Sequence, residues 1–183
     1  MSTEPREAAL LQRVSSLEEL GQDESALAIA LAELVDYYCE VGRHQSAEAP
    51  MLRRLELCQY LHGPKHTAVA RCLHDLAFLY EKLRRDAAVE DFAYRAMAMW
   101  AEIDGYANGH VTRMLELLAR LYARQGRHEK LCAVMDASIP EIERVYPRGY
   151  HDYSLAQLAE LLSGDDRSAE LQRIAERIRA LLD

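Results

Sequence analysis

The stretch YCEVGRH (38–44) returns almost unchanged as YARQGRH (122–128), and this echo decides the fold class. Tyr38 and Tyr122 stand 84 positions apart, and Tyr80 lies midway between them. The sequence therefore repeats every 42 residues. A repeat of about 20 to 50 residues is typical of solenoids, in which each unit stacks on its neighbours and buries a shared core.

Further columns follow the same period without a gap over more than 120 residues. They hold leucines, small residues and glycines: Leu31, Leu73 and Leu115; Leu34, Leu76 and Leu118; Ala28, Ala70, Thr112 and Ser154; Gly21, Gly63 and Gly105. Within a repeat, as from Leu73 to Tyr80, apolar residues fall at i, i+3, i+4 and i+7, which is one stripe of an α-helix. Each repeat is therefore predicted to be two antiparallel helices, A and B.

The predicted architecture is an all-α solenoid of about nine helices that forms a single domain over residues 1–183. A leading helix at 5–20 precedes repeats at 24–62, 66–103 and 108–146 and a shortened C-terminal pair at 152–182. The A helices are expected near 24–41, 66–83, 108–125 and 152–163, and the B helices near 44–62, 86–103, 128–146 and 166–182. The last A helix is predicted to be about one turn short, because aligning GDDRSAE (164–170) with GRHQSAE (42–48) requires the deletion of four residues.

Two local features depart from a regular helix pair. Gly42 and Gly126 follow A helices, where glycine adopts the left-handed conformation that ends a helix without a steric penalty. The middle repeat has Arg84 at this position, so its turn is predicted to be either strained or built differently. Pro140 lies inside a B helix, where a lost backbone hydrogen bond predicts a kink that costs about 3 kcal/mol unless neighbouring residues adapt.

Composition limits the classes of function. The formal net charge is −8 and the charged residues are spread along the chain, which disfavours nucleic acid as a partner. The N-terminal residues do not resemble a secretory signal, and no apolar stretch is long enough to span a bilayer. The four cysteines are scattered without a CxxC pair, which is typical of free thiols in a reducing compartment. We therefore expect a cytoplasmic protein that does not bind membranes.

The residues that could carry chemistry have simpler interpretations. His62 and His66 have a spacing used by metal ligands, but a Gly-Pro pair breaks the helix between them. His44 and His128 follow Gly-Arg at the start of B helices, and no carboxylate or nucleophile accompanies both copies. Cys58 aligns with apolar positions of the other repeats and is expected to be buried. Because phosphate-binding, dinucleotide-binding and hydrolase motifs are also absent, we predict no enzyme activity, cofactor or metal.

These columns resemble the tetratricopeptide repeat, in the 42-residue form typical of kinesin light chains. The matching residues belong to the A-helix columns, the glycine after helix A and the small residue early in helix B: Leu31, Leu73, Leu115, Ala77, Ala119, Tyr38, Tyr80, Tyr122, Gly42, Gly126, Ala47 and Ala169. The stretch 42–80 is especially similar to that subfamily, including Pro50 and the Gly-Pro-x-His turn at 63–66. The resemblance covers about residues 5–182. It implies a right-handed α-α superhelix that binds a peptide or protein segment in a concave groove lined by A helices.

By the same resemblance, nine residues are predicted to face a partner: Asp36, Glu40, Arg71, His74, Phe78, Arg113, Glu116, Arg120 and Arg124. The paired asparagines of the kinesin-light-chain groove are absent, so binding by an asparagine ladder is not expected. The three arginines at 113, 120 and 124 lie roughly on one helix face, and the planar arginine fork suits carboxylates. One interpretation is a basic groove segment that binds acidic residues or a C-terminal carboxylate. The other is that the arginines form surface ion pairs with Glu81, Glu102 and Glu116.

The predicted function is that of a non-enzymatic adaptor or scaffold for a protein or peptide. Two alternatives stay open, namely a self-associating structural protein, with the choice between monomer and homodimer undecided, and a sensor of a small effector or signalling peptide. Light scattering distinguishes the first alternative, and ligand-dependent melting distinguishes the second.

Overall fold

The computed structural model describes residues 5–21, 23–106, 109–145, 153–164 and 169–183. These residues form nine helices: α1 (Pro5–Leu20), α2 (Glu24–Glu40), α3 (His44–His62), α4 (Thr67–Lys82), α5 (Asp86–Asp104), α6 (Gly109–Gln125), α7 (His128–Val145), α8 (Tyr153–Leu162) and α9 (Ala169–Leu182). Each helix begins and ends within three residues of its predicted bounds. The predicted bounds at 108, 146, 152 and 166 lie outside the described residues.

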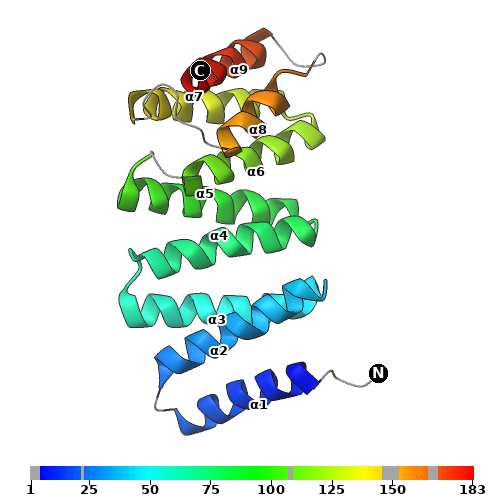
Figure 1. The fold of residues 1–183 in the computed structure, drawn as a ribbon, viewed down its shortest axis with the longest axis vertical. Coiled ribbons are helices and arrows are strands. Elements are labelled where there is room, and N and C mark those ends of the chain that lie inside the picture. The colour runs from blue at the N-terminus through cyan, green and yellow to red at the C-terminus, as the bar shows by residue number, and fades with distance from the viewer. Residues whose placement is uncertain (1–4, 22, 107–108, 146–152, 165–168) are drawn as a thin grey trace. The chain divides into compact units, whose positions relative to one another are not determined.

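The chain divides into two compact units, Met1–Ala88 and Val89–Asp183, which we call the first and the second unit. In the first unit, α1 packs on α2, α2 on α3 and α3 on α4, so that consecutive helices lie side by side (Figure 1). In the second unit, α6 packs against α7 and α8, and α9 packs against the same two helices. The first unit therefore contains the predicted pair α2–α3, and the second unit contains the predicted pairs α6–α7 and α8–α9.

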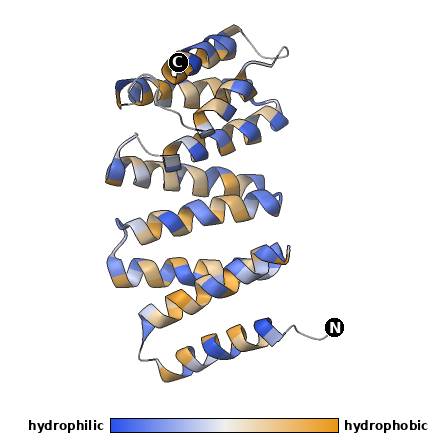
Figure 2. Cartoon of the chain, in the orientation of Figure 1, coloured by the Kyte–Doolittle hydropathy of each residue, from blue (hydrophilic) through white to orange (hydrophobic). Residues whose placement is uncertain are grey.

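The core of each unit is built from the repeating columns. Apolar and polar residues are mixed along every helix, as an amphipathic helix requires (Figure 2). The leucine and tyrosine columns are at most 6% exposed: Leu31, Leu34, Leu73, Leu76, Leu115, Leu118, Tyr38, Tyr80 and Tyr122. Burying one such side chain contributes about 2 kcal/mol to the stability of the fold. These positions recur because each repeat needs the same buried contacts.

The turns after α2, α4 and α6 have the same backbone design. In each, the second residue of the turn donates a backbone hydrogen bond to the tyrosine of the column: Arg43 to Tyr38 at 2.8 Å, Arg85 to Tyr80 at 3.0 Å and Arg127 to Tyr122 at 3.0 Å. The preceding residue is left-handed, with φ of 72° at Gly42, 56° at Arg84 and 67° at Gly126. The turn at Arg84 is therefore strained rather than built differently, because a side chain in this conformation costs about 1–2 kcal/mol.

Pro140 lies within α7 without ending it, since the helix continues to Val145. The proline side chain is exposed, so it displaces nothing in the core. The predicted kink stays a prediction. Among the described residues, no helix is both long enough and apolar enough to cross a membrane.

Candidate partner-binding surfaces

The first surface comprises the predicted partner-facing residues of the first unit, namely Asp36 and Glu40 on α2 and Arg71, His74 and Phe78 on α4. Asp36, Glu40 and Arg71 are exposed, and Phe78 is half-buried. His74 is only 6% exposed, and its ring packs against Phe78 at a centroid distance of 5.1 Å. His74 therefore orients the phenylalanine and presents little surface of its own.

The α2 side of the first surface is acidic. Glu40 accepts a hydrogen bond from Arg6 of α1 at 2.6 Å, but both side chains are more than half exposed, so this ion pair is weak. Burial, and then the negative charges of Asp36 and Asp75, raise the pKa of the nearby Cys39 thiol. Asp75 belongs to α4, so both helices contribute negative charge beside Cys39.

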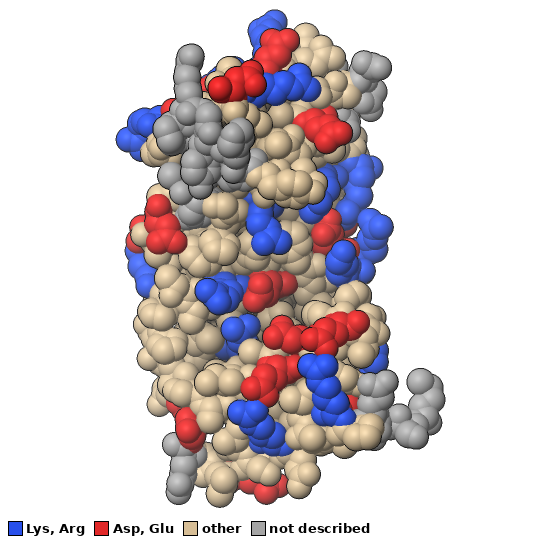
Figure 3. Space-filling model, in the orientation of Figure 1, with Lys and Arg blue, Asp and Glu red and all other residues tan. Residues whose placement is uncertain are grey.

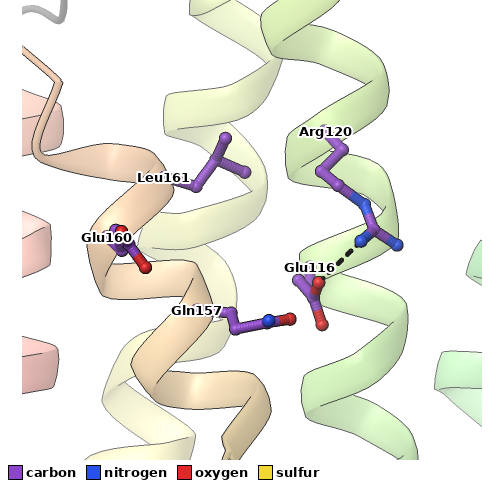
Figure 4. A pocket seen from close by; sticks show the side chains of 5 residues that line it. All are labelled: Glu116, Arg120, Gln157, Glu160 and Leu161. Carbon is purple, nitrogen blue, oxygen red and sulfur yellow. Dashed lines mark hydrogen bonds and ion pairs between the residues drawn. The ribbon is translucent and has the colours of Figure 1, made fainter.

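The second surface comprises Arg113, Glu116, Arg120 and Arg124, all on α6. Arg113 and Arg124 are exposed, Arg120 is half-buried and Glu116 is 7% exposed. Nη1 of Arg120 donates to Oε1 of Glu116 at 2.8 Å (Figure 4). For Arg120, the ion-pair interpretation is therefore confirmed, and its guanidinium compensates a carboxylate that is largely removed from water.

A pocket of about 280 Å³ opens between α6 and α8 beside this ion pair. It is lined by Glu116, Arg120, Gln157, Glu160 and Leu161. In Figure 4, the Gln157 side chain extends from α8 toward Glu116. Sequence reasoning did not select Gln157 or Glu160, because the shortened last A helix needed a deletion before its positions could be aligned.

Charges are intermixed on the face of each unit drawn in Figure 3. Acidic side chains stand beside basic ones in both units, which is unlike the continuous basic footprint of a nucleic-acid-binding surface. Recognition on such a surface depends on individual side chains rather than on a broad field.

Sequence reasoning also missed the partners of three arginines that recur with the 42-residue period, namely Arg43, Arg85 and Arg127. Each such arginine joins the column tyrosine to a glutamate of the preceding B helix, forming three Glu–Tyr–Arg clusters: Glu7, Tyr38 and Arg43; Glu48, Tyr80 and Arg85; Glu90, Tyr122 and Arg127. The first two clusters lie in the first unit and the third lies in the second unit. Glu48 and Glu90 stand one period apart, but Glu7 precedes Glu48 by only 41 residues, so the three glutamates do not form a complete column.

The geometry of the clusters is similar in each repeat. The guanidinium carbon lies over the tyrosine ring, 5.0 Å from the centroid for Arg43, 5.8 Å for Arg85 and 4.9 Å for Arg127. Such cation–π contacts contribute about 0.5–1 kcal/mol at exposed sites. The cluster therefore fastens the end of each A helix to the B helix before it.

The third cluster holds the most strongly shifted carboxyl group. Burial opposes ionisation of Glu90, but hydrogen bonds from Lys130 at 2.7 Å and Arg127 at 2.8 Å outweigh it and lower its pKa to about 2. Burial, and then hydrogen bonds to Tyr94 and Glu90, raise the pKa of Tyr122. Glu90 is therefore ionised and Tyr122 neutral throughout the physiological range.

His44, His62, His66 and His128 lie at helix ends or in turns. The rings of His62 and His66 stack at 4.4 Å, and Nδ1 of His66 accepts a hydrogen bond from the backbone N–H of Ala68. His44 and His128 are the first residues of α3 and α7. In the part of the chain that the structure describes, no group of three or more His, Cys, Asp or Glu side chains is arranged to hold a metal ion.

The family comparison bears on the first unit and the start of the second. Residues 26–102 match the family model described as Tetratricopeptide repeat. Repeats of this family are generally protein-interaction modules. The match confirms the resemblance to tetratricopeptide repeats that the sequence columns indicated.

Solved structures share the fold of the chain. One is the crystal structure of nearly identical TPR-like repeats of a putative kinesin light chain from Podosopora anserina. It is 17% identical in sequence with a TM-score of 0.74, and the match covers 96% of this chain and 84% of that one. BtubC (BKLC) from P. vanneervenii is 18% identical with a TM-score of 0.68, covering 95% of this chain and 72% of that one. These likenesses confirm the predicted all-α superhelical fold class. Among curated protein sequences, none is significantly similar to this chain.

Proposed function

We propose that the protein is a non-enzymatic adaptor that binds peptide or protein segments at the second surface and, as a separate site, at the first surface. The observation that carries the proposal is the α6 face, where exposed Arg113 and Arg124 accompany an open pocket at the Glu116–Arg120 pair. Tetratricopeptide repeats as a class bind proteins, which supports the same assignment.

The chemistry of the second surface favours a partner with carboxylates. Arg113 and Arg124 offer planar donors that bind acidic side chains or a C-terminal carboxylate with two parallel hydrogen bonds. Arg120 plays a different part, because it holds Glu116 at the pocket wall and so positions the groups that line it. In the first surface, Phe78 supplies an apolar anchor, Arg71 a cation, and Asp36 and Glu40 contacts for basic residues.

The test begins with random peptides displayed on phage and selected on the immobilised full chain. Affinities of the selected peptides are then measured by fluorescence anisotropy for R113E/R124E and for a matched control, R173E/R179E. The control reverses the same amount of charge at exposed positions of α9 in the same unit. Arg120 is left unchanged, since a glutamate there would face the nearly buried Glu116.

R113E/R124E is expected to bind the selected peptides about tenfold or more weakly than the native chain does. Each charge-assisted hydrogen bond that is lost contributes about 1.5–3 kcal/mol to binding. The control is expected to bind within about twofold of the native chain. Equal affinities of the two variants, with unchanged helical circular dichroism, would overturn the proposal. Failure to select peptides, together with dimers in sedimentation velocity, would instead favour the self-associating scaffold.

A further inference from the structure

Two cysteines of the first unit are in direct contact. Cys58 lies on α3 and Cys72 on α4, and their Sγ atoms are 3.8 Å apart, with the Cys72 thiol donating to Cys58. Cys58 is 5% exposed and Cys72 is fully buried. The sequence predicted burial of Cys58 but not this pairing, because the cysteines recur in no column.

An ion pair borders the two thiols. Arg54 precedes Cys58 by four residues on α3, and Asp75 follows Cys72 by three residues on α4. The Arg54 guanidinium lies 3.6 Å from the Asp75 carboxylate, and its side chain is only 19% exposed. The positive charge of Arg54 acts on both sulfur atoms and favours a thiolate, because its side chain is largely removed from water.

The two sulfur atoms differ in acidity. The hydrogen bond from Cys72 lowers the pKa of Cys58 to about 7, against the opposing effect of burial, and Arg54 adds to this lowering. The same hydrogen bond, and then burial, raise the pKa of Cys72. Near neutral pH, Cys58 therefore supplies the thiolate and Cys72 keeps its proton.

We propose that Cys58 and Cys72 are a thiol-oxidation site, which hydroperoxides convert to a reversible disulfide between α3 and α4. The site is independent of the proposed adaptor function. Cys58 is the attacking residue, since it keeps a small exposed area, and Cys72 is the resolving residue.

The reaction balances in two steps. The Cys58 thiolate attacks a peroxide oxygen, so that an S–O bond forms, the O–O bond breaks and the leaving oxygen takes a proton, which yields a sulfenic acid. Cys72 then attacks the Cys58 sulfur, so that an S–S bond forms and the S–O bond breaks with release of water. Two thiols are oxidised, and one hydrogen peroxide is reduced to two molecules of water.

The geometry requires only a local adjustment. A disulfide has an S–S length of about 2.05 Å, so the sulfur atoms must approach by about 1.8 Å from their separation of 3.8 Å. Helices α3 and α4 already pack against one another. The bond would close a short loop between residues 58 and 72, and we expect it to raise the melting temperature by about 5 °C.

The other two cysteines are internal controls. Cys39 is exposed, but its pKa is raised by burial and by Asp36 and Asp75, so it is mostly protonated. Cys132 lies in the second unit and is partly exposed. If accessibility alone governed oxidation, Cys39 would react first.

The first experiment treats the reduced full-length protein with hydrogen peroxide, alkylates the remaining thiols and maps the peptides by mass spectrometry. The expected product is a Cys58–Cys72 disulfide that dithiothreitol reduces. Cys39 and Cys132 are expected to remain reduced and therefore to be alkylated. Oxidation of Cys39 while Cys58 and Cys72 stay alkylated would overturn the proposal.

The second experiment separates the roles of the two sulfur atoms and does not depend on forming the disulfide. In C72S, peroxide is expected to leave a sulfenic acid on Cys58 that dimedone captures, whereas C58S gives no dimedone adduct at Cys72. In addition, R54Q is expected to slow disulfide formation at least threefold, and the matched variant R53Q, at an exposed arginine paired with Glu56, leaves the rate unchanged. Equal rates for R54Q and R53Q, or dimedone capture at Cys72 in C58S, would contradict the assignment.

Discussion

Arg124 and Arg127 of the stretch YARQGRH lie only three positions apart, but their surroundings differ. Arg127 belongs to a Glu–Tyr–Arg cluster, where it donates to Glu90 and covers the ring of Tyr122. Arg124 is exposed on the second surface. The sequence distinguishes them only through their counterparts one and two repeats earlier.

The counterparts of Arg127 are Arg85 and Arg43, whereas those of Arg124 are Lys82 and Glu40. Arg43, Arg85 and Arg127 recur in all three repeats and bind a glutamate in each, so their identity follows from the packing. A side chain that changes, even in the sign of its charge, is not required by the packing. Recurrence therefore marks residues that hold the helix pairs together, and we expect residues that vary on an exposed face to contact a partner.

The largest effect is expected for Tyr122→Ala, which empties a position that is fully buried. Removing a large buried side chain costs about 3–5 kcal/mol of unfolding free energy. Chemical denaturation measures this loss, with Tyr153→Ala as the control, because Tyr153 is 76% exposed. A similar loss in both variants would break the link between recurrence and stability.

The next effect compares the two arginines directly. Arg127→Gln is expected to lower the unfolding free energy by about 1–2 kcal/mol, because Glu90 loses one of its two cationic partners. Arg124→Gln is expected to change it by less than about 0.5 kcal/mol. Urea denaturation of the two variants tests the difference, and a larger loss for Arg124→Gln would reverse the comparison.

A smaller effect is expected at the turn after α4, where Arg84 takes the place of the glycine found in the other repeats. Arg84→Gly is expected to stabilise the protein by about 1 kcal/mol, because glycine adopts a φ of 56° without steric strain. Gly126→Ala is expected to destabilise by a similar amount, since alanine would carry the strain that Arg84 carries now. Opposite signs in thermal melts support a shared turn design, and equal signs would argue against it.

The smallest effect is on the pH dependence of stability. The pKa of Glu90 falls from an ordinary value of 4.5 to about 2 on folding, so its contribution is present above pH 4.5 and is lost as the pH falls toward 2. We expect about 1 kcal/mol or less, because solvent screens part of the interaction. The slope of unfolding free energy against pH between 5 and 2.5 should be shallower in Glu90→Gln. An unchanged slope would mean that the Glu90 carboxylate does not contribute to the pH dependence of stability.

Much of the fold follows from the sequence because it depends on local periodicity. The left-handed turns at Gly42 and Gly126 and the burial of Cys58 were predicted correctly, and the helix bounds were predicted to within three residues. The Arg120–Glu116 pair was also foreseen, because both residues lie one turn apart on a single helix.

Contacts between helices were harder to predict. The partners of Arg43 and of Cys58 lie on other helices, and finding them requires the rotation of each helix about its axis. The repeating columns give the period but not this rotation. Gln157 and Glu160 were missed for a related reason, since the shortened α8 shifts the alignment of the last pair.

The central claim is that recurring residues maintain the fold and varying exposed residues bind a partner. Saturation mutagenesis of the whole chain, scored for folded abundance and for binding of the selected peptides, tests it most directly. We predict that substitutions at the column tyrosines and their arginine and glutamate partners reduce abundance, whereas substitutions at Arg113 and Arg124 reduce binding at unchanged abundance. Loss of binding at Tyr38, Tyr80 or Tyr122 with full abundance, or loss of abundance at Arg113 and Arg124, would contradict the account.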